Sequence, residues 1–272
     1  MKAVLGTALA LSLLTGCAPK AIAFTTPSKP PGATEAQWEM EQMKAGCMKK
    51  KGFKYVPHVS RKPEKTDPQR RAAEGDHVAA RELRAKYGHQ IFASYVYPDD
   101  PAAGALVADE DDRYVNLLGR LNDSQLIVYQ ADLGTCAHEA FKAVLHKEVK
   151  SFFDLITQRG DALRQLRTRR LDGDPRLVEQ AVAFGDCLVA KGYRVTSRKP
   201  TDLAQRGSRT FGAQLKRLGQ GERELTAEQA RPYLARGIED ALDDLACGKD
   251  FYARYSPADS AIIEEIDAEF GM

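Results

Sequence analysis

Cysteines carry the clearest chemistry in this sequence, and the first of them follows an export signal. Cys17 comes directly after Leu14-Thr15-Gly16, at the end of an apolar run that begins behind Lys2. A basic residue, a short apolar run and small residues before a cleavage point are typical of a secretory signal peptide, and this run is too short to span a membrane. The sequence also matches a bacterial lipobox, whose cysteine is linked to diacylglycerol. We therefore predict that residues 1–16 form a lipoprotein signal peptide and that Cys17 is acylated, with an ordinary signal peptide as the alternative.

The other four cysteines are Cys47, Cys136, Cys187 and Cys247. In an exported chain they would meet an oxidising compartment, where disulfides are the expected state, and four cysteines allow three connectivities. A structural zinc site is the rival interpretation, but no two of them stand at the short spacing that such sites use, either from each other or from a histidine. The sequence therefore predicts two disulfides.

An internal similarity favours one connectivity. Two segments share a predicted helix end with a cysteine, a glycine that ends the helix and an aromatic residue that opens an extended segment: Cys47, Gly52 and Phe53 in the first, Cys187, Gly192 and Tyr193 in the second. Aligned at the later cysteines, Asp132 matches Asp243 and Cys136 matches Cys247. We predict that the chain is a duplication. If each unit was once self-sufficient, Cys47 pairs with Cys136 and Cys187 with Cys247.

The composition predicts a mainly helical protein in four parts. Alanine, leucine and charged residues are abundant, whereas long runs of β-branched residues are scarce. We expect the signal peptide in residues 1–16, a proline-rich tether in 17–33, a first helical repeat in 34–173 and a second in 174–272. The predicted fold class is therefore mainly α, with two related, disulfide-stapled helical repeats and a small β element on a lipid-anchored tether.

Several boundaries follow from local signals. Capping boxes at Thr34 and Thr226 predict helix starts, and so does Asp174 before a proline. We expect one helix from Asp67 to Tyr87. Alternating apolar residues predict a strand over 91–97 that pairs with residues 53–56 as the small β element.

Two later helices are less regular in sequence. A long helical pattern extends from about residue 124 to residue 171, with a break expected near Gly134 or Gly160. The last helix is predicted to be capped at Ser256 and to end near Phe270.

Charge and motifs exclude several function classes. Forty basic and 38 acidic residues leave a formal charge of +2, unlike the strong basic bias of most nucleic-acid-binding proteins. No nucleophile elbow, phosphate-binding loop or dinucleotide fingerprint is present, and Lys142 stands where a zinc protease needs a second histidine after His138. We therefore assign no catalytic residue, no metal ligand and no cofactor, and we expect no nucleic-acid partner. His58, His77 and His89 could still converge in space.

Two charged clusters each allow a functional and a structural interpretation. The acidic residues 109–112 could bind a hard cation, but a solvated first turn of a helix accounts for them as well. Five arginines between 159 and 170 could meet anionic lipids or cell-wall polymers, although cations near a helix C-terminus are favoured by the helix dipole in any protein. The structural interpretation is preferred for both.

A family resemblance rests on short motifs. Cys47-Met48 with Gly52-Phe53 and Tyr55, then Lys86-Tyr87-Gly88 and a leucine-rich segment before Cys136, resembles a group of uncharacterised secreted proteins and lipoproteins of actinobacteria. The resemblance covers most of residues 34–272. It implies an envelope protein with paired cysteines and supplies no activity.

Two hypotheses on function follow. The first is an extracytoplasmic envelope protein, held on the bacterial cell membrane through acylated Cys17, that serves as a binding or scaffolding module for a small ligand or an envelope protein. The alternative is a cell-wall-active hydrolase with a site assembled from distant residues. If the protein is a hydrolase, we expect a cleft where His58, His77 or His89 approaches an Asp or Glu with a perturbed pKa. If it is a binding module, we expect an apolar groove without such a pair.

Overall fold

The computed structural model describes residues 28–59, 64–104, 118–219 and 225–272. Within these ranges the chain is mainly helical, and no strand is present. No helix of this part is both long enough and apolar enough to cross a membrane. The predicted signal peptide, Cys17 and most of the tether lie outside the described residues.

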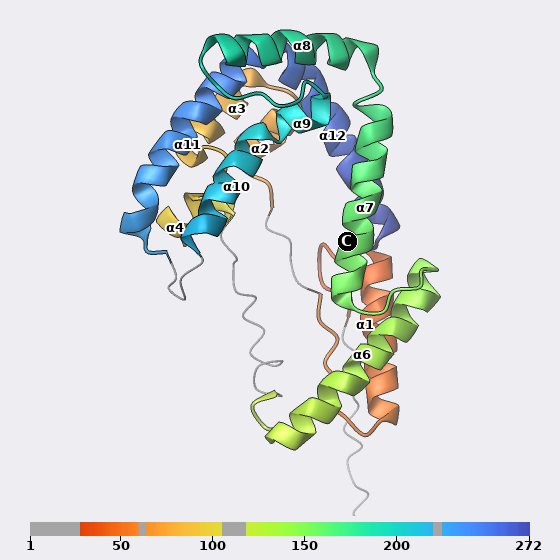
Figure 1. The fold of residues 1–272 in the computed structure, drawn as a ribbon. Helices are drawn as coiled ribbons and strands as arrows, with labels where there is room; N and C mark the ends of the chain where they lie inside the picture. Colours follow the sequence, from red (N-terminus) through yellow and green to blue (C-terminus); the bar gives the residue numbers. More distant parts are fainter. Residues whose placement is uncertain (1–27, 60–63, 105–117, 220–224) are drawn as a thin grey trace, which may run out of the picture.

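The helices form an arch (Figure 1). In chain order they are α1 (Glu35–Lys50), α2 (Asp67–Ala73), α3 (His77–Tyr87), α4 (Ala93–Val96), α6 (Asp123–Leu145), α7 (Phe152–Arg170), α8 (Pro175–Ala190), α9 (Pro200–Ala204), α10 (Arg206–Leu218), α11 (Ala227–Cys247) and α12 (Lys249–Glu269). Helix α8 lies along the top of the arch; α10 and α11 descend on one side, and α7 and α12 descend on the other, towards α1 and α6.

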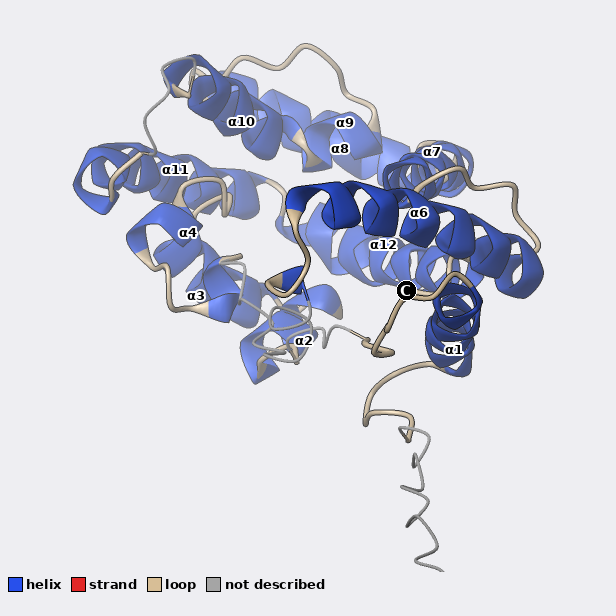
Figure 2. Cartoon of the chain, turned by 90° about the horizontal axis from the view of Figure 1, so that it is seen from below, coloured by secondary structure: helices blue, strands red, loops and turns tan. Residues whose placement is uncertain are grey.

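Seen from below, the arch has three layers (Figure 2). Helices α7, α8, α9 and α10 form one layer, and α1, α2, α3 and α4 form the opposite one. Between them lie α11 and α12, which follow each other almost end to end at Gly248. The middle pair therefore positions residues from both outer layers.

Several predicted helix starts are confirmed. Thr34 caps α1 and Thr226 caps α11, each in a reciprocal capping box with the glutamine three residues later. The Asp174 carboxylate accepts hydrogen bonds from two backbone N–H groups at the start of α8, whose first residue is Pro175. Each cap satisfies N–H groups that have no partner within the helix, so these short sequence signals determine the boundaries.

The predicted small β element is wrong. Residues 93–96 form the short helix α4, because the buried side chains are Phe92, Ala93 and Val96, which have helical rather than alternating spacing. The Phe92 ring stacks on Tyr233 of α11 with centroids 5.1 Å apart. The 53–56 segment has no strand partner; its Phe53 ring instead packs edge-on against Tyr129 of α6.

The single helix expected from Asp67 to Tyr87 is divided into α2 and α3. Gly75 lies between them with φ +91°, a backbone conformation that a helix cannot use. A Cβ atom there would lie only 2.6 Å from the Ala253 carbonyl oxygen, so the break lets this turn approach the start of α12 closely. Asp76 then caps α3.

The expected breaks at Gly134 and Gly160 are also wrong. Both glycines lie within helices, and the chain turns instead between Leu145 and Phe152. His146 takes a left-handed conformation with φ 54°, and the buried Val149 fixes the loop to the core. The last helix starts at Lys249, not after Ser256, although its end before Phe270 is as expected.

Three clusters make up the core of the described residues. The largest lies where α7, α8 and α12 meet, and the rings of Phe184, Phe251 and Tyr252 pack together there. A second joins α3 and α4 to α10 and α11. The third joins α1 to α6 around Met48 and Tyr129.

Candidate functional site

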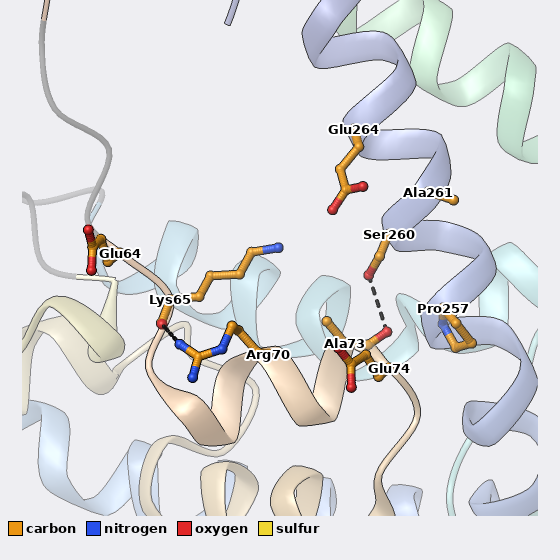
Figure 3. Close-up of a pocket in the computed structure, with 9 residues that line it drawn as sticks. All are labelled: Glu64, Lys65, Arg70, Ala73, Glu74, Pro257, Ser260, Ala261 and Glu264. Carbon is orange, nitrogen blue, oxygen red and sulfur yellow. Dashed lines mark hydrogen bonds between the residues drawn. The ribbon is translucent and has the colours of Figure 1, made fainter. Parts of the chain in front are cut away.

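An open groove lies between α2 and α12 (Figure 3), with a volume of about 590 Å³. We call it the α2–α12 groove. Its lining residues are Glu64, Lys65, Arg70, Ala73 and Glu74 on one side, and Pro257, Ser260, Ala261 and Glu264 on the other. The first group comes from α2 and the residues that flank it, and the second comes from α12 alone.

The lining residues from α12 lie on one face of that helix because of their spacing. Pro257, Ser260, Ala261 and Glu264 follow one another at spacings of three, one and three residues, so they share one face of the helix. The Ser260 hydroxyl donates a hydrogen bond of 3.3 Å to the Ala73 carbonyl oxygen at the end of α2. This contact fixes the two walls to each other.

The α2 side is held by its own capping interactions. Thr66 and Gln69 form a reciprocal capping box at the start of α2. The Arg70 guanidinium donates to the Lys65 carbonyl oxygen at 2.8 Å and to the Asp67 carboxylate at 2.9 Å. The backbone that carries Lys65 is therefore tied to α2, while the Lys65 ammonium group is left for other contacts.

Charges of both signs face this hollow. Figure 3 shows the Lys65 amino group extending across the groove towards α12, where the Glu264 carboxylate points into the same space. Within the described part of the chain, no hydrogen bond or ion pair engages the side-chain charges of Lys65, Glu74 or Glu264. Ala73, Pro257 and Ala261 add apolar surface. The groove can therefore hold a ligand that carries a negative and a positive group on a partly apolar body.

A histidine and a carboxylate do meet elsewhere, between the α3–α4 turn and α11. His89 Nε2 lies 2.7 Å from Asp240 Oδ1, and Arg206 of α10 donates to the other carboxylate oxygen at 3.2 Å. Burial opposes ionisation of Asp240, but the hydrogen bonds from His89 and Arg206 outweigh it and hold the pKa of Asp240 below its usual range. The His89 ring also stacks on Phe211.

This histidine–carboxylate pair is closed to ligands. The side chains of His89, Asp240 and Arg206 are each about one-tenth exposed, at 8%, 11% and 10%. The cavity beside His89 has no room for a water molecule. The pair lacks the open cleft that hydrolysis requires, and its evident effect is to join α3, α10 and α11.

The remaining candidate histidines are separated. The His58 backbone N–H donates to the Glu41 carboxylate, and His77 is the first residue of α3. His138 Nδ1 lies 2.6 Å from the Val149 carbonyl oxygen. In the part of the chain that the structure describes, no three histidine, cysteine or acidic side chains are placed to hold a metal ion. The acidic residues 109–112 lie outside that part.

The arginine cluster of α7 mainly joins helices. Arg159, Arg167 and Arg170 form ion pairs with Asp267, Asp259 and Glu265 of α12, and Arg164 pairs with Asp161 of its own helix. These contacts support the structural interpretation of the cluster. Surface pairs of this kind stabilise a protein only weakly, but a row of them sets the register between two helices.

The four cysteines form two disulfides, Cys47–Cys136 and Cys187–Cys247, the connectivity that the internal similarity favours. They join α1 to α6 and α8 to α11. Two disulfides indicate an oxidising, extracytoplasmic environment.

Matching contacts accompany each disulfide. Lys51 pairs with Asp132 at 2.7 Å, and Lys191 pairs with Asp243 at 2.6 Å. The backbone N–H of Phe53 donates to the Met48 carbonyl oxygen and that of Tyr193 to the Leu188 carbonyl oxygen, both at 3.0 Å, so each aromatic residue closes the helix that precedes it. One difference remains: the Tyr193 hydroxyl donates to Asp243, whereas Phe53 has no hydroxyl group.

Comparison with known proteins identifies no relative. No protein-family model, no curated protein and no solved structure matches this chain. The resemblance suggested by the short sequence motifs therefore stays a prediction.

Sequence reasoning missed the α2–α12 groove, and the apolar groove expected of a binding module differs from this one, which charged side chains line on both walls. Its two walls are about 190 residues apart along the chain, and no motif links them. One local signal was available: the stripe of Pro257, Ser260, Ala261 and Glu264 is too small and too polar for a core face. The predicted start of the last helix at Ser256 placed this stripe at a helix end and hid it.

Proposed function

We propose that this protein is an exported, lipid-anchored binding module whose ligand site is the α2–α12 groove. The observation that carries the proposal is that Lys65 faces Glu264 across an open hollow, with Glu74 on the same wall as Lys65, and that none of these three charges is paired within the described residues. Unpaired opposite charges on two walls are complementary to a ligand that carries both signs. Short peptides and amino-acid derivatives have this chemistry.

The size of the groove suits such a ligand. A volume of about 590 Å³ falls inside the range of roughly 300 to 1,000 Å³ that small-molecule sites occupy. The apolar surfaces of Ala73, Pro257 and Ala261 can contact a short side chain while the two charged ends are held. A partner protein that inserts a peptide segment is accommodated by the same chemistry.

Location forms the second part of the proposal. The predicted signal peptide and the lipobox that ends at Cys17 support a location on the outer face of a membrane, and the two disulfides are consistent with an oxidising, extracytoplasmic compartment. Acylation supplies an anchor because each buried methylene contributes about 0.8 kcal/mol. Residues 17–33 then act as the tether.

We also propose that the two disulfide-linked helix pairs derive from one ancestral unit. The support comes from the matched lysine–aspartate pairs, Lys51–Asp132 and Lys191–Asp243, and from the same closing hydrogen bond after each helix. In this proposal residues 34–173 and 174–272 are the two repeats. The groove draws on both, because α2 belongs to the first and α12 to the second.

A cell-wall-active hydrolase finds less support. The arrangement expected of it is a cleft where a histidine approaches a carboxylate of perturbed pKa. His89 and Asp240 form such a pair, but the space beside them excludes even water. The α2–α12 groove is open. Among its described lining residues, however, the only hydroxyl nucleophile is Ser260, which donates to a backbone carbonyl oxygen, and none is a histidine.

Isothermal titration with short peptides tests the ligand site. Each peptide is used in two forms, one with free termini and one that is N-acetylated and C-amidated. We expect free peptides to bind more tightly than capped ones. Lys65→Ala should weaken binding of the free form about tenfold, because one charge-assisted hydrogen bond contributes roughly 1.5 kcal/mol, and Glu264→Gln should do the same from the other end.

Lys49→Ala is the matched control. Lys49 is an exposed lysine in the last turn of α1, outside the groove, so its removal changes the net charge equally and should leave affinity unchanged. Equal affinities of the two peptide forms, or equal losses in the Lys65 and Lys49 variants, would show that the groove does not select ligands by charge.

A further inference from the structure

Two adjacent phenylalanines at the start of α7 are the most exposed aromatic residues of the described chain. Phe152 is 67% exposed and Phe153 is 80% exposed, and Ile156 one turn later is 42% exposed. The three side chains are neighbours on the helix surface because they stand three and four residues apart. We call them the α7 apolar patch.

The patch is rigidly presented. Ser151 caps α7 by accepting a hydrogen bond from the Asp154 backbone N–H, and the Asp154 carboxylate accepts one from the Lys150 backbone N–H at 2.8 Å. The buried Val149 and Leu155 hold both sides of the turn in the core. Folding therefore fixes two exposed rings side by side on a capped helix start, where they form one apolar surface with Ile156.

The small area of the patch argues against a stable protein partner. A phenylalanine side chain offers about 200 Å², so the exposed parts of the three residues total roughly 350 Å². A stable protein interface buries about 800 Å² on each partner. A patch of less than half that size suits a surface to which the protein is already tethered, because tethering supplies an effective concentration on the order of millimolar.

The α7 apolar patch follows a loop that lies near the point where the N-terminal tether joins the folded part. Ala36, in the first turn of α1, and Leu145, at the end of α6, both lie against Gly271 just beyond α12. Lys147, in the loop that leads to the patch, forms an ion pair of 2.6 Å with Glu269. The start of α1 and the loop that leads into α7 therefore both lie near the C-terminal end of α12. Residues 18–33, extended at about 3 Å each, reach roughly 50 Å.

We infer that the α7 apolar patch inserts into the surface of the bilayer that anchors the chain, so that the end of α12 faces the membrane. This inference rests on the proposed lipid anchor. Phenylalanine rings at the boundary between headgroups and acyl chains bury apolar area, while the exposed Lys150 beside them faces the headgroups. The patch then orients the folded part on the membrane instead of leaving it free on its tether.

Vesicle flotation of residues 18–272 tests this inference without the acyl group. This chain contains every residue that the structure describes, and the vesicles consist of phosphatidylethanolamine and phosphatidylglycerol. We expect weak association at millimolar lipid, and a loss of at least about tenfold in the partition coefficient of the double variant Phe152→Ser with Phe153→Ser. The matched control is Val78→Ser with Val182→Ser, two exposed apolar residues on α3 and α8, which should leave the partition coefficient unchanged.

Three results would overturn the inference. The unacylated chain could fail to bind vesicles, the patch variant could bind as well as the unchanged chain, or the control could lose as much binding as the patch variant. Sedimentation velocity without lipid adds a further outcome: self-association that the patch variant abolishes would assign the patch to a second copy. Peptide affinity of the groove and acylation of Cys17 are measured separately, so failure of the proposed function is distinguishable from failure of this inference.

Discussion

Gly207 offers a sharp test of the closed His89–Asp240 pair. This glycine lies in the first turn of α10, where the His89 imidazole approaches the helix backbone. An added Cβ would overlap the ring at three of its atoms. Gly207→Ala must therefore displace His89, and with it the hydrogen bond to Asp240.

The expected cost combines three effects. A lost hydrogen bond to a charged group costs about 1.5 to 3 kcal/mol, and overpacking at a buried contact costs about 1 to 3 kcal/mol. Against this, alanine is favoured over glycine in a helix by about 1 kcal/mol. The free energy of unfolding should fall by about 2 to 5 kcal/mol, which lowers Tm by at least about 4 °C in a chain of this size.

Gly212→Ala is the control in the same helix. A Cβ at Gly212 meets nothing within 4 Å, so only the helix propensity changes. This variant should be more stable than the unchanged protein by about 0.5 to 1 kcal/mol. Thermal and urea unfolding, followed by circular dichroism, measure both variants.

A double variant tests whether the overlap with His89 causes the destabilisation. If the overlap with His89 is the cause, His89→Ala should be destabilising alone, yet adding Gly207→Ala to it should cost nothing further. Equal stabilisation by the two glycine substitutions, or full additivity of Gly207→Ala with His89→Ala, would show that His89 does not occupy the position described.

Further predictions concern the same scaffold. Two double variants remove one disulfide each, by replacing Cys47 and Cys136, or Cys187 and Cys247, with serine. Each should lower the free energy of unfolding by up to about 4 to 5 kcal/mol, because the bridges close loops of 89 and 60 residues in the unfolded chain. Urea unfolding of the two variants measures this loss, and stability equal to that of the bridged protein would contradict it. The lowered pKa of Asp240 means that its ionised form contributes stability above the unfolded pKa of about 4, which is lost as the pH falls through the lower folded value. Asp240→Asn should therefore reduce stability at neutral pH and flatten its fall in acid, and an unchanged acid limb would refute the assignment.

Local signals in the sequence predicted several helix starts. Thr34, Asp174 and Thr226 cap helices where the sequence predicts them, because a cap is a bond between residues only two or three positions apart. The cysteine pairing also followed from the chain, since the two similar segments suggested which partners belong together. Both kinds of inference depend on spacing alone.

The errors share a physical cause, which is tertiary packing. Residues 91–97 alternate like a strand, but the contact of Phe92 with Tyr233 selects a helical turn. Gly75 breaks a helix because the backbone of Ala253 needs to approach it. The α2–α12 groove was equally unpredictable, since Lys65 and Glu264 come together only through packing between distant segments.

Native mass spectrometry of the protein extracted from membranes shows whether the α2–α12 groove binds a ligand. We expect a small bound molecule in preparations of the unchanged protein, and its loss in the double variant Lys65→Ala with Glu264→Gln prepared in parallel. The same bound mass in both preparations, or no bound mass in either, would contradict the assignment of the α2–α12 groove as a ligand site.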